Sequence, residues 1–77
     1  MLEIGYSTLE FFERFTTEER AAIRLSSQSN QVVADFMQLA TAAQMVINTD
    51  PMTIAGMDYL TAIGLISQNR RNEILGS

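Results

Sequence analysis

The chain of 77 residues carries nine acidic and five basic side chains, a net charge of −4, and contains no histidine and no cysteine. This length gives room for one domain, and the missing residue types exclude a disulfide, a histidine- or cysteine-bound structural metal and a Ser-His-Asp catalytic arrangement. Yet 47% of the residues are apolar, more than the thin core of so small a chain can use. Part of the surface is therefore predicted to be apolar and to meet a partner.

The charge and hydropathy patterns narrow the kinds of partner. All five basic residues are arginines, and an acidic surface repels phosphate backbones, which disfavours general nucleic-acid binding. No apolar run approaches the roughly 18 residues that would span a bilayer, and the start, residues 1–5, is acidic where a signal sequence would be basic. We therefore expect a soluble protein, without a membrane partner, that is retained where it is made.

Helix-start signals open the chain. Ser7 and Glu10 fit a capping box, in which the hydroxyl and the carboxylate each accept a hydrogen bond from the other residue's backbone amide. Tyr6 and Phe11 occupy the hydrophobic-staple positions on either side of this cap. The pattern predicts a short helix over residues 8–14, preceded by an extended N-terminal arm at residues 1–7.

The central part of the chain predicts two further helices. Thr16 and Glu19 form a second capping box, which predicts a helix over residues 17–27. Apolar residues at helical spacing then predict a helix over residues 30–47, with a main stripe of Val32, Phe36, Leu39, Ala43 and Val46 that is widened by Val33, Ala40 and Ile47. The polar cluster at residues 26–30 favours a bend, although residues 17–47 as one bent helix remain an alternative to two helices.

The last third of the chain also contains signals for the start and end of helices. Asp50 caps a helix that begins at Pro51, and Gly64 is placed to end it in a left-handed conformation, with Leu65 folding back onto Leu60. Ser67 caps a final short helix over residues 68–75. The sequence thus predicts an all-α fold, a compact bundle of four to five short helices that forms one domain over residues 1–77.

No constellation in the sequence predicts catalysis. The carboxylate pairs Glu10/Glu13 and Glu18/Glu19 fall in or near exposed helix turns, where acids stabilise the helix dipole. The four glycines are scattered singly, so no phosphate-binding loop is present. We expect a protein that is not an enzyme and that binds no cofactor and no metal.

The aromatic segment near the N-terminus is the candidate protein interface. Five large apolar side chains fall within ten residues, and one helix face cannot accommodate all of them because Phe11 and Phe12 diverge by about 100°. Aromatic side chains are favoured anchors at interfaces. The candidate anchors are Tyr6, Leu9, Phe11, Phe12 and Phe15; the alternative is that these rings close the small core. Met37, Met45, Met52 and Met57 are predicted to fill core gaps, with an adaptable binding groove as the alternative.

A helix-turn-helix is the alternative functional pattern. Residues 59–67 place a glycine turn between two helices, and Arg70 and Arg71 would then face phosphates or bases. The turn is one residue longer than usual, and the arginines stand where a core-facing apolar residue is needed. A solvated face or ion pairing with an acid is the competing interpretation for both arginines.

Two stretches resemble small helical proteins encoded among the structural genes of tailed bacteriophages. The resemblance rests on residues 12–23, and near the end on the aspartate–proline turn, Gly64-Leu65, Arg70 or Arg71, and Glu73-Ile74-Leu75. It implies a minor virion component at the tail or a connector, made in the bacterial cytoplasm, and it supplies no functional residues. The sequence therefore favours a structural or adaptor protein that contacts copies of itself or a larger virion protein. The alternative is a small phage regulatory protein, either a helix-turn-helix DNA binder or an acidic inhibitor of a host enzyme.

Overall fold

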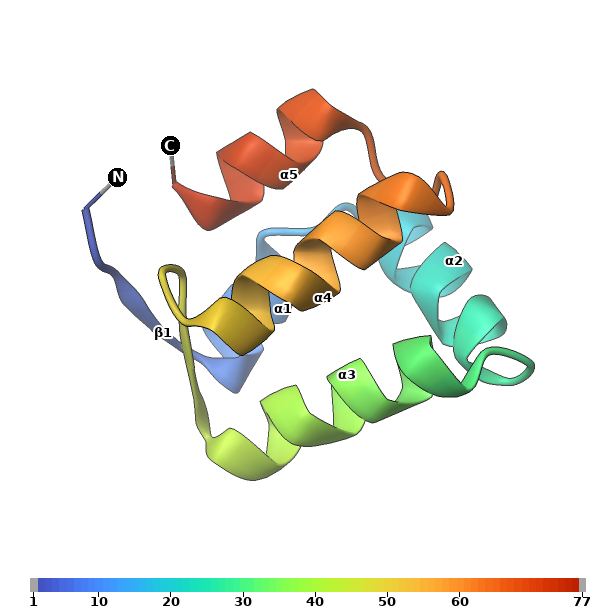
Figure 1. The fold of residues 1–77 in the computed structure, drawn as a ribbon, viewed down its shortest axis with the longest axis horizontal. Coiled ribbons are helices and arrows are strands. Elements are labelled where there is room, and N and C mark those ends of the chain that lie inside the picture. Colours follow the sequence, from blue (N-terminus) through green and yellow to red (C-terminus); the bar gives the residue numbers. More distant parts are fainter. Residues whose placement is uncertain (1, 77) are drawn as a thin grey trace.

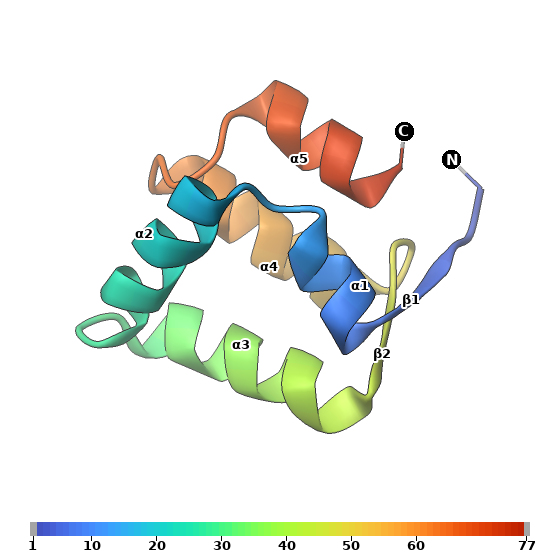
Figure 2. The same ribbon diagram turned by 180° about the vertical axis from the view of Figure 1, so that it is seen from behind.

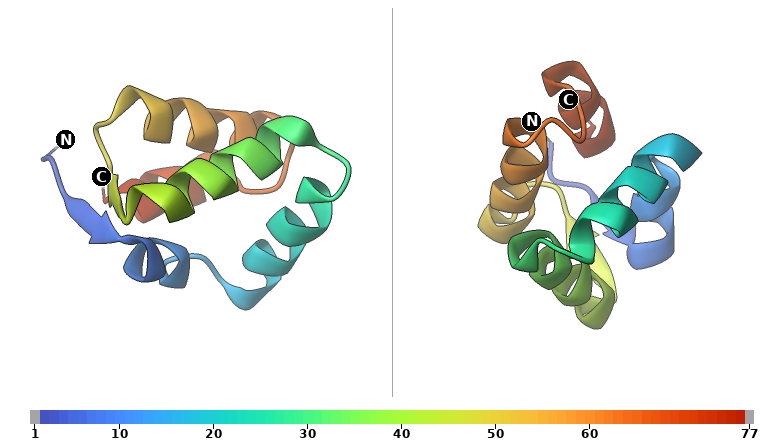
Figure 3. Two further views of the ribbon diagram at one scale, coloured as in Figure 1. Left: turned by 90° about the horizontal axis from the view of Figure 1, so that it is seen from below. Right: turned by 90° about the vertical axis from the view of Figure 1, so that its right-hand side faces the viewer.

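The computed structural model describes residues 2–76, and within them it contains five helices and a two-stranded antiparallel sheet. In Figure 1, α4 lies between α3 and α5, α1 passes behind α4, and α2 closes the right-hand side. Figure 2 shows α1 and the start of α2 from behind, and Figure 3 shows that the first and last described residues lie at the same end of the molecule. In chain order the elements are β1 Gly5–Ser7, α1 Thr8–Glu13, α2 Thr17–Ser27, α3 Gln31–Ala43, β2 Met45–Ile47, α4 Pro51–Ala62 and α5 Gln68–Leu75.

The predicted capping boxes are present at the starts of α1 and α2. The amide of Glu10 donates to the Ser7 hydroxyl over 3.1 Å, and the amide of Ser7 donates to the Glu10 carboxylate over 3.0 Å. Thr16 and Glu19 repeat this exchange at 3.1 and 2.7 Å. The helix starts were predictable because each cap is satisfied by side chains within three residues.

The end of α4 also follows the prediction. Gly64 has φ +83° and its amide donates to the carbonyl of Thr61, while the amide of Leu65 donates to the carbonyl of Leu60 over 3.0 Å. This pair of hydrogen bonds is the Schellman pattern, which a residue with a Cβ would strain at the glycine position. The turn directs the chain into α5, whose first free amides are capped by the Ser67 hydroxyl.

The small sheet corrects the all-α prediction and the predicted extent of the third helix. The helix ends at Ala43 rather than Ile47, because Gln44 adopts a left-handed conformation with φ +63°. Residues 45–47 then form β2, which pairs with β1 in the register Gly5↔Ile47, Tyr6↔Val46 and Ser7↔Met45. The apolar residues of this segment continued the helical spacing by coincidence, and the partner that makes them a strand lies about 40 positions away in the chain. Gln28–Asn30 separate α2 from α3, so residues 17–47 do not form one helix.

The N-terminal arm is extended, and a buried asparagine holds it against the domain. Asn48 is fully buried. The side-chain oxygen of Asn48 accepts a hydrogen bond from the backbone amide of Ile4 over 2.7 Å. Its side-chain nitrogen donates to the backbone carbonyls of Leu2 and Leu75, each over 2.8 Å. One side chain thus joins the arm, the end of β2 and the end of α5.

The core is apolar and draws on every helix. Phe11 and Phe15 pack edge-on with ring centroids 5.4 Å apart, and Tyr6 reaches Phe11 at 6.4 Å, the contact expected of a hydrophobic staple. The buried apolar residues are Phe11, Phe15, Ile23, Val33, Ala40, Val46, Met57, Leu60, Ile66, Ile74 and Leu75.

Helices α3 and α4 approach each other most closely where the Phe36 ring lies over Gly56. A Cβ built on Gly56 would lie 2.2 Å from the nearest ring carbon of Phe36. Gly56→Ala is therefore expected to lower the free energy of unfolding by about 1–3 kcal/mol, because overpacking outweighs the gain in helix propensity. Urea denaturation measures this change. In a Phe36→Ala background the same substitution should cost nothing or stabilise; an equal loss in both backgrounds would show that the ring contact is not the cause.

Candidate protein-binding surface

The structure divides the five predicted aromatic and aliphatic anchors between core and surface. Phe11 and Phe15 are 0% and 3% exposed, so both rings belong to the core and are not available to a partner. Tyr6 and Phe12 are half-buried and pack against that core. Leu9, at 72% exposed, is the one predicted anchor that presents most of its side chain to solvent. For Phe11 and Phe15 the alternative prediction, that the rings close the core, is therefore the correct one.

The two arginines of the nucleic-acid alternative both have acidic partners within the chain. Arg70 forms a two-pronged ion pair with Glu19, both contacts at 2.9 Å, and Arg71 lies 2.6 Å from Asp58. Arg70 also donates to the carbonyl of Arg14 over 3.0 Å. These contacts tie α5 to α2 and to α4, so the described structure gives both side chains a structural role.

The ion pair between Glu19 and Arg70 makes stability depend on pH. Hydrogen bonds from Arg70 hold the pKa of Glu19 below its ordinary value of 4.5. The Glu19 carboxylate therefore binds a proton more readily in the unfolded chain than in the folded one. The ion pair stabilises the fold fully above pH 4.5, and this stabilisation is lost as the pH falls through the lower pKa of the folded state. Glu19→Gln keeps the capping residue but removes the charge.

The expected result is that wild-type and Glu19→Gln proteins differ most in unfolding free energy near pH 7 and converge on acidification below about pH 4.5. Chemical denaturation at a series of pH values measures this difference. Glu10→Gln is the control, since Glu10 occupies the same position in a capping box but has no arginine partner in the salt bridges of residues 2–76. A difference that stayed constant with pH would show that the charge of Glu19 does not stabilise the fold.

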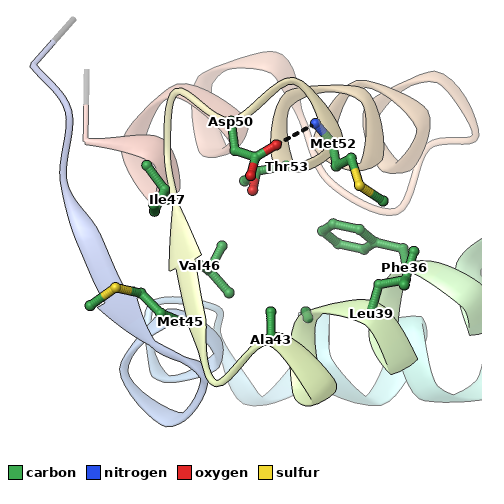
Figure 4. Close-up of a pocket in the computed structure, with 10 residues that line it drawn as sticks. Phe36, Leu39, Ala43, Met45, Val46, Ile47, Asp50, Met52 and Thr53 are labelled. Carbon is green, nitrogen blue, oxygen red and sulfur yellow. Dashed lines mark hydrogen bonds between the residues drawn. The ribbon is translucent and has the colours of Figure 1, made fainter.

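An apolar groove lies between α3, β2 and the start of α4 (Figure 4). It has a volume of about 180 Å³. Phe36 and Leu39 project into it from α3, Val46 from β2, and Met52 from α4, while Asp50 stands at the end where α4 begins. Two side chains that project into the groove are more than half exposed, namely Leu39 at 51% and Met52 at 59%. The side chain of Met45, 53% exposed, turns away from the groove toward Gly5 (Figure 4).

The groove arises from the width of the apolar stripe on α3. Part of the predicted main stripe faces solvent, since Val32 and Leu39 are each 51% exposed. The residues predicted to widen the stripe, Val33 and Ala40, are instead buried. The stripe is thus wide enough for one edge to face the core and the other to form the wall of the groove, a distinction that periodicity alone does not make. Met45 and Met52 likewise lie at the surface instead of filling the core.

The groove face carries negative charge and no positive charge. Between Gln31 and Ala62 the sequence contains Asp35, Asp50 and Asp58 and no arginine or lysine. Asp58 is paired with Arg71, whereas Asp35 and Asp50 are exposed. One oxygen of Asp50 accepts from the amide of Met52 over 2.9 Å and so caps α4. Of the two exposed aspartates, Asp50 lines the groove.

Residues 2–76 contain no cluster of three or more histidine, cysteine, aspartate or glutamate side chains that could hold a metal ion. The lowered pKa values of Glu10 and Glu19 arise from cap hydrogen bonds and, for Glu19, chiefly from Arg70. No helix within this part of the chain combines the length and the apolar character needed to cross a membrane.

The sequence predicted a partly apolar surface, and exposed apolar side chains are present among the described residues. The predicted interface at the aromatic segment stays a prediction, although Phe11 and Phe15 are buried. The excess of apolar residues was the signal, and Leu39, Met45 and Met52 account for much of it at the surface. Of residues 12–23, which carry the first part of the resemblance to phage structural proteins, Phe15 and Ile23 are buried and Thr16 and Glu19 cap α2. Comparison of the chain with protein-family models, with curated proteins and with solved structures finds no match.

Proposed function

We propose that this is a non-enzymatic structural or adaptor protein that works through protein–protein contacts made at the groove between α3, β2 and α4. The observation that supports this proposal most directly is the pair of half-exposed apolar side chains that project into the groove, Leu39 and Met52. Apolar surface exposed around a concave site gains free energy when a partner covers it. Methionine adds adaptability, since its unbranched side chain can follow the shape of a partner.

The setting of this function comes from the resemblance to phage structural proteins. We propose a minor virion component, made in the bacterial cytoplasm and bound to a larger virion protein or to further copies of the chain. The residue composition supports a binding role over a catalytic one, because histidine, cysteine and lysine are all missing. The DNA-binding alternative has less support, since Arg70 and Arg71 are engaged in ion pairs within the chain.

Sedimentation of a native lysate tests the proposal. The chain is followed across the gradient by mass spectrometry, for the wild type and for Leu39→Ser at the groove. Leu9→Ser on α1 is the matched control, because it removes an exposed leucine from a different surface. We expect wild type and Leu9→Ser to run with a large particle at fixed stoichiometry, and Leu39→Ser to shift to the light fractions. A wild-type chain found only in the light fractions would contradict the virion assignment, and equal behaviour of the two variants would contradict the assignment of the groove.

A further inference from the structure

A second exposed apolar position lies on α2. Leu25 is 69% exposed, and it shares one face of the helix with Ala21 and Arg24, both exposed, at the i, i+3 and i+4 positions. We call Ala21, Arg24 and Leu25 the α2 face. It is apolar at Ala21 and Leu25 and positive at Arg24, whereas the groove is lined by apolar side chains and has the acid Asp50 at one end.

The charge on the α2 face is not used within the chain. Arg70 and Arg71 form ion pairs, and Arg14 donates to the carbonyls of Glu73 and Ile74 at the end of α5. Within residues 2–76, the arginines of α2, Arg20 and Arg24, take part in no ion pair. Among the described residues, the arginines without an acidic partner are thus Arg14, Arg20 and Arg24, and two of these three lie on α2. The groove is lined by Asp50 and by no basic residue.

These two surfaces cannot meet in one molecule. Helix α3 begins beside α2 and ends at β2, so α2 and the groove lie at opposite ends of α3 (Figure 1). The contact is therefore possible only between two copies. Because different surfaces of the two copies would meet, the contact is heterologous, and its repetition produces a closed ring or an open filament.

We propose that the groove is occupied by the α2 face of a second copy of this chain, with Leu25 against Leu39 and Met52, and Arg24 near Asp50. This inference rests on the proposed function of the groove and names its partner. Burial of leucine against an apolar groove supplies the attraction, and the arginine–aspartate pair sets the orientation.

Sedimentation velocity of the purified chain tests this pairing, at protein concentrations up to about 1 mM, where weak association is measurable. Leu25→Glu and Leu39→Glu are matched variants, since each places an acid at an exposed leucine. Each variant alone is expected to remain monomeric. Their equimolar mixture is expected to form a 1:1 dimer that grows no further, because one intact α2 face and one intact groove remain.

Charge neutralisation provides the second arm. Asp50→Asn keeps the cap of α4, as asparagine also accepts from the Met52 amide, and Arg24→Gln keeps the helix. Each is expected to weaken association about tenfold, with the double variant no weaker than either single variant, as for two groups that act as a pair.

Three results would overturn the inference. One is a wild-type chain that stays monomeric at every concentration. Another is association that Leu39→Glu abolishes and Leu25→Glu leaves unchanged, which would indicate a two-fold contact of groove against groove. The third is a mixture of the two variants that stays monomeric. If the monomeric chain still sediments with a large particle in lysate, the proposed function stands and the groove binds a different protein.

Discussion

Phe11→Ala is expected to lower the free energy of unfolding by about 3–5 kcal/mol, the cost typical of removing a fully buried phenylalanine ring. Phe11 is 0% exposed and its ring lies 5.4 Å from those of both Phe12 and Phe15. A core of this size supplies only about 3–5 kcal/mol in total, so the variant should lose its cooperative unfolding transition near room temperature. Urea denaturation followed by circular dichroism measures the loss.

Leu9 provides the matched control for Phe11 within the same helix. It is 72% exposed, so Leu9→Ala should change stability by no more than about 0.5 kcal/mol. Phe11→Leu keeps most of the buried volume and should remain folded with reduced stability. Full helicity and an unchanged midpoint for Phe11→Ala would show that the ring lies at the surface, as an interface anchor would.

Asn48→Ala is the second substitution with a large expected effect, a loss of about 2–4 kcal/mol. The variant removes one buried hydrogen bond, to the Leu75 carbonyl, and two part-buried ones, with the Ile4 amide and the Leu2 carbonyl. A buried group left without its partner costs more than a typical hydrogen bond contributes. Asn48→Asp should be at least as harmful, because a carboxylate would face two carbonyl oxygens. Hydrogen exchange should also show faster exchange of the Ile4 amide.

The control for Asn48 is Asn69, which is exposed on α5. Asn69→Ala should stay within about 0.5 kcal/mol of the wild type. If both alanine variants had equal stability, the three hydrogen bonds of Asn48 would not hold the N-terminal arm in solution.

The elements that could be predicted are those whose signals are local. The starts of α1, α2, α4 and α5 depend on capping side chains within three residues of the helix, and the end of α4 depends on a glycine that adopts a left-handed conformation. Each of these signals acts over one turn, so a single sequence contains all of it.

The elements that could not be predicted depend on contacts between distant parts of the chain. Residues 45–47 are a strand because β1 lies beside them, and no local pattern distinguishes this segment from a helix end. The role of Asn48 depends on three separate segments meeting at one buried point. Its position just before a helix cap gave no sign that it would be enclosed.

The sequence predicted an exposed apolar surface, but it did not determine which side chains form that surface. The excess of apolar residues correctly indicated an exposed apolar surface. The aromatic residues on α1 were predicted to be the interface because large rings are common interface anchors. In a domain this small the same rings are also the most effective core residues. Leu39 and Met52 instead form the groove, since the core is already filled by Phe11, Met57 and Leu60 from other directions.

Oxidation footprinting tests most directly whether the groove is the surface that a partner covers. Hydrogen peroxide transfers one oxygen atom to an accessible methionine sulfur, giving a sulfoxide and water. Met45 and Met52 are 53% and 59% exposed, and Met57 is fully buried and serves as the internal control. The free chain is expected to oxidise at Met45 and Met52 and not at Met57. In the assembled form the groove account predicts that Met52 becomes protected, whereas oxidation of Met52 at the rate of the free chain would contradict it.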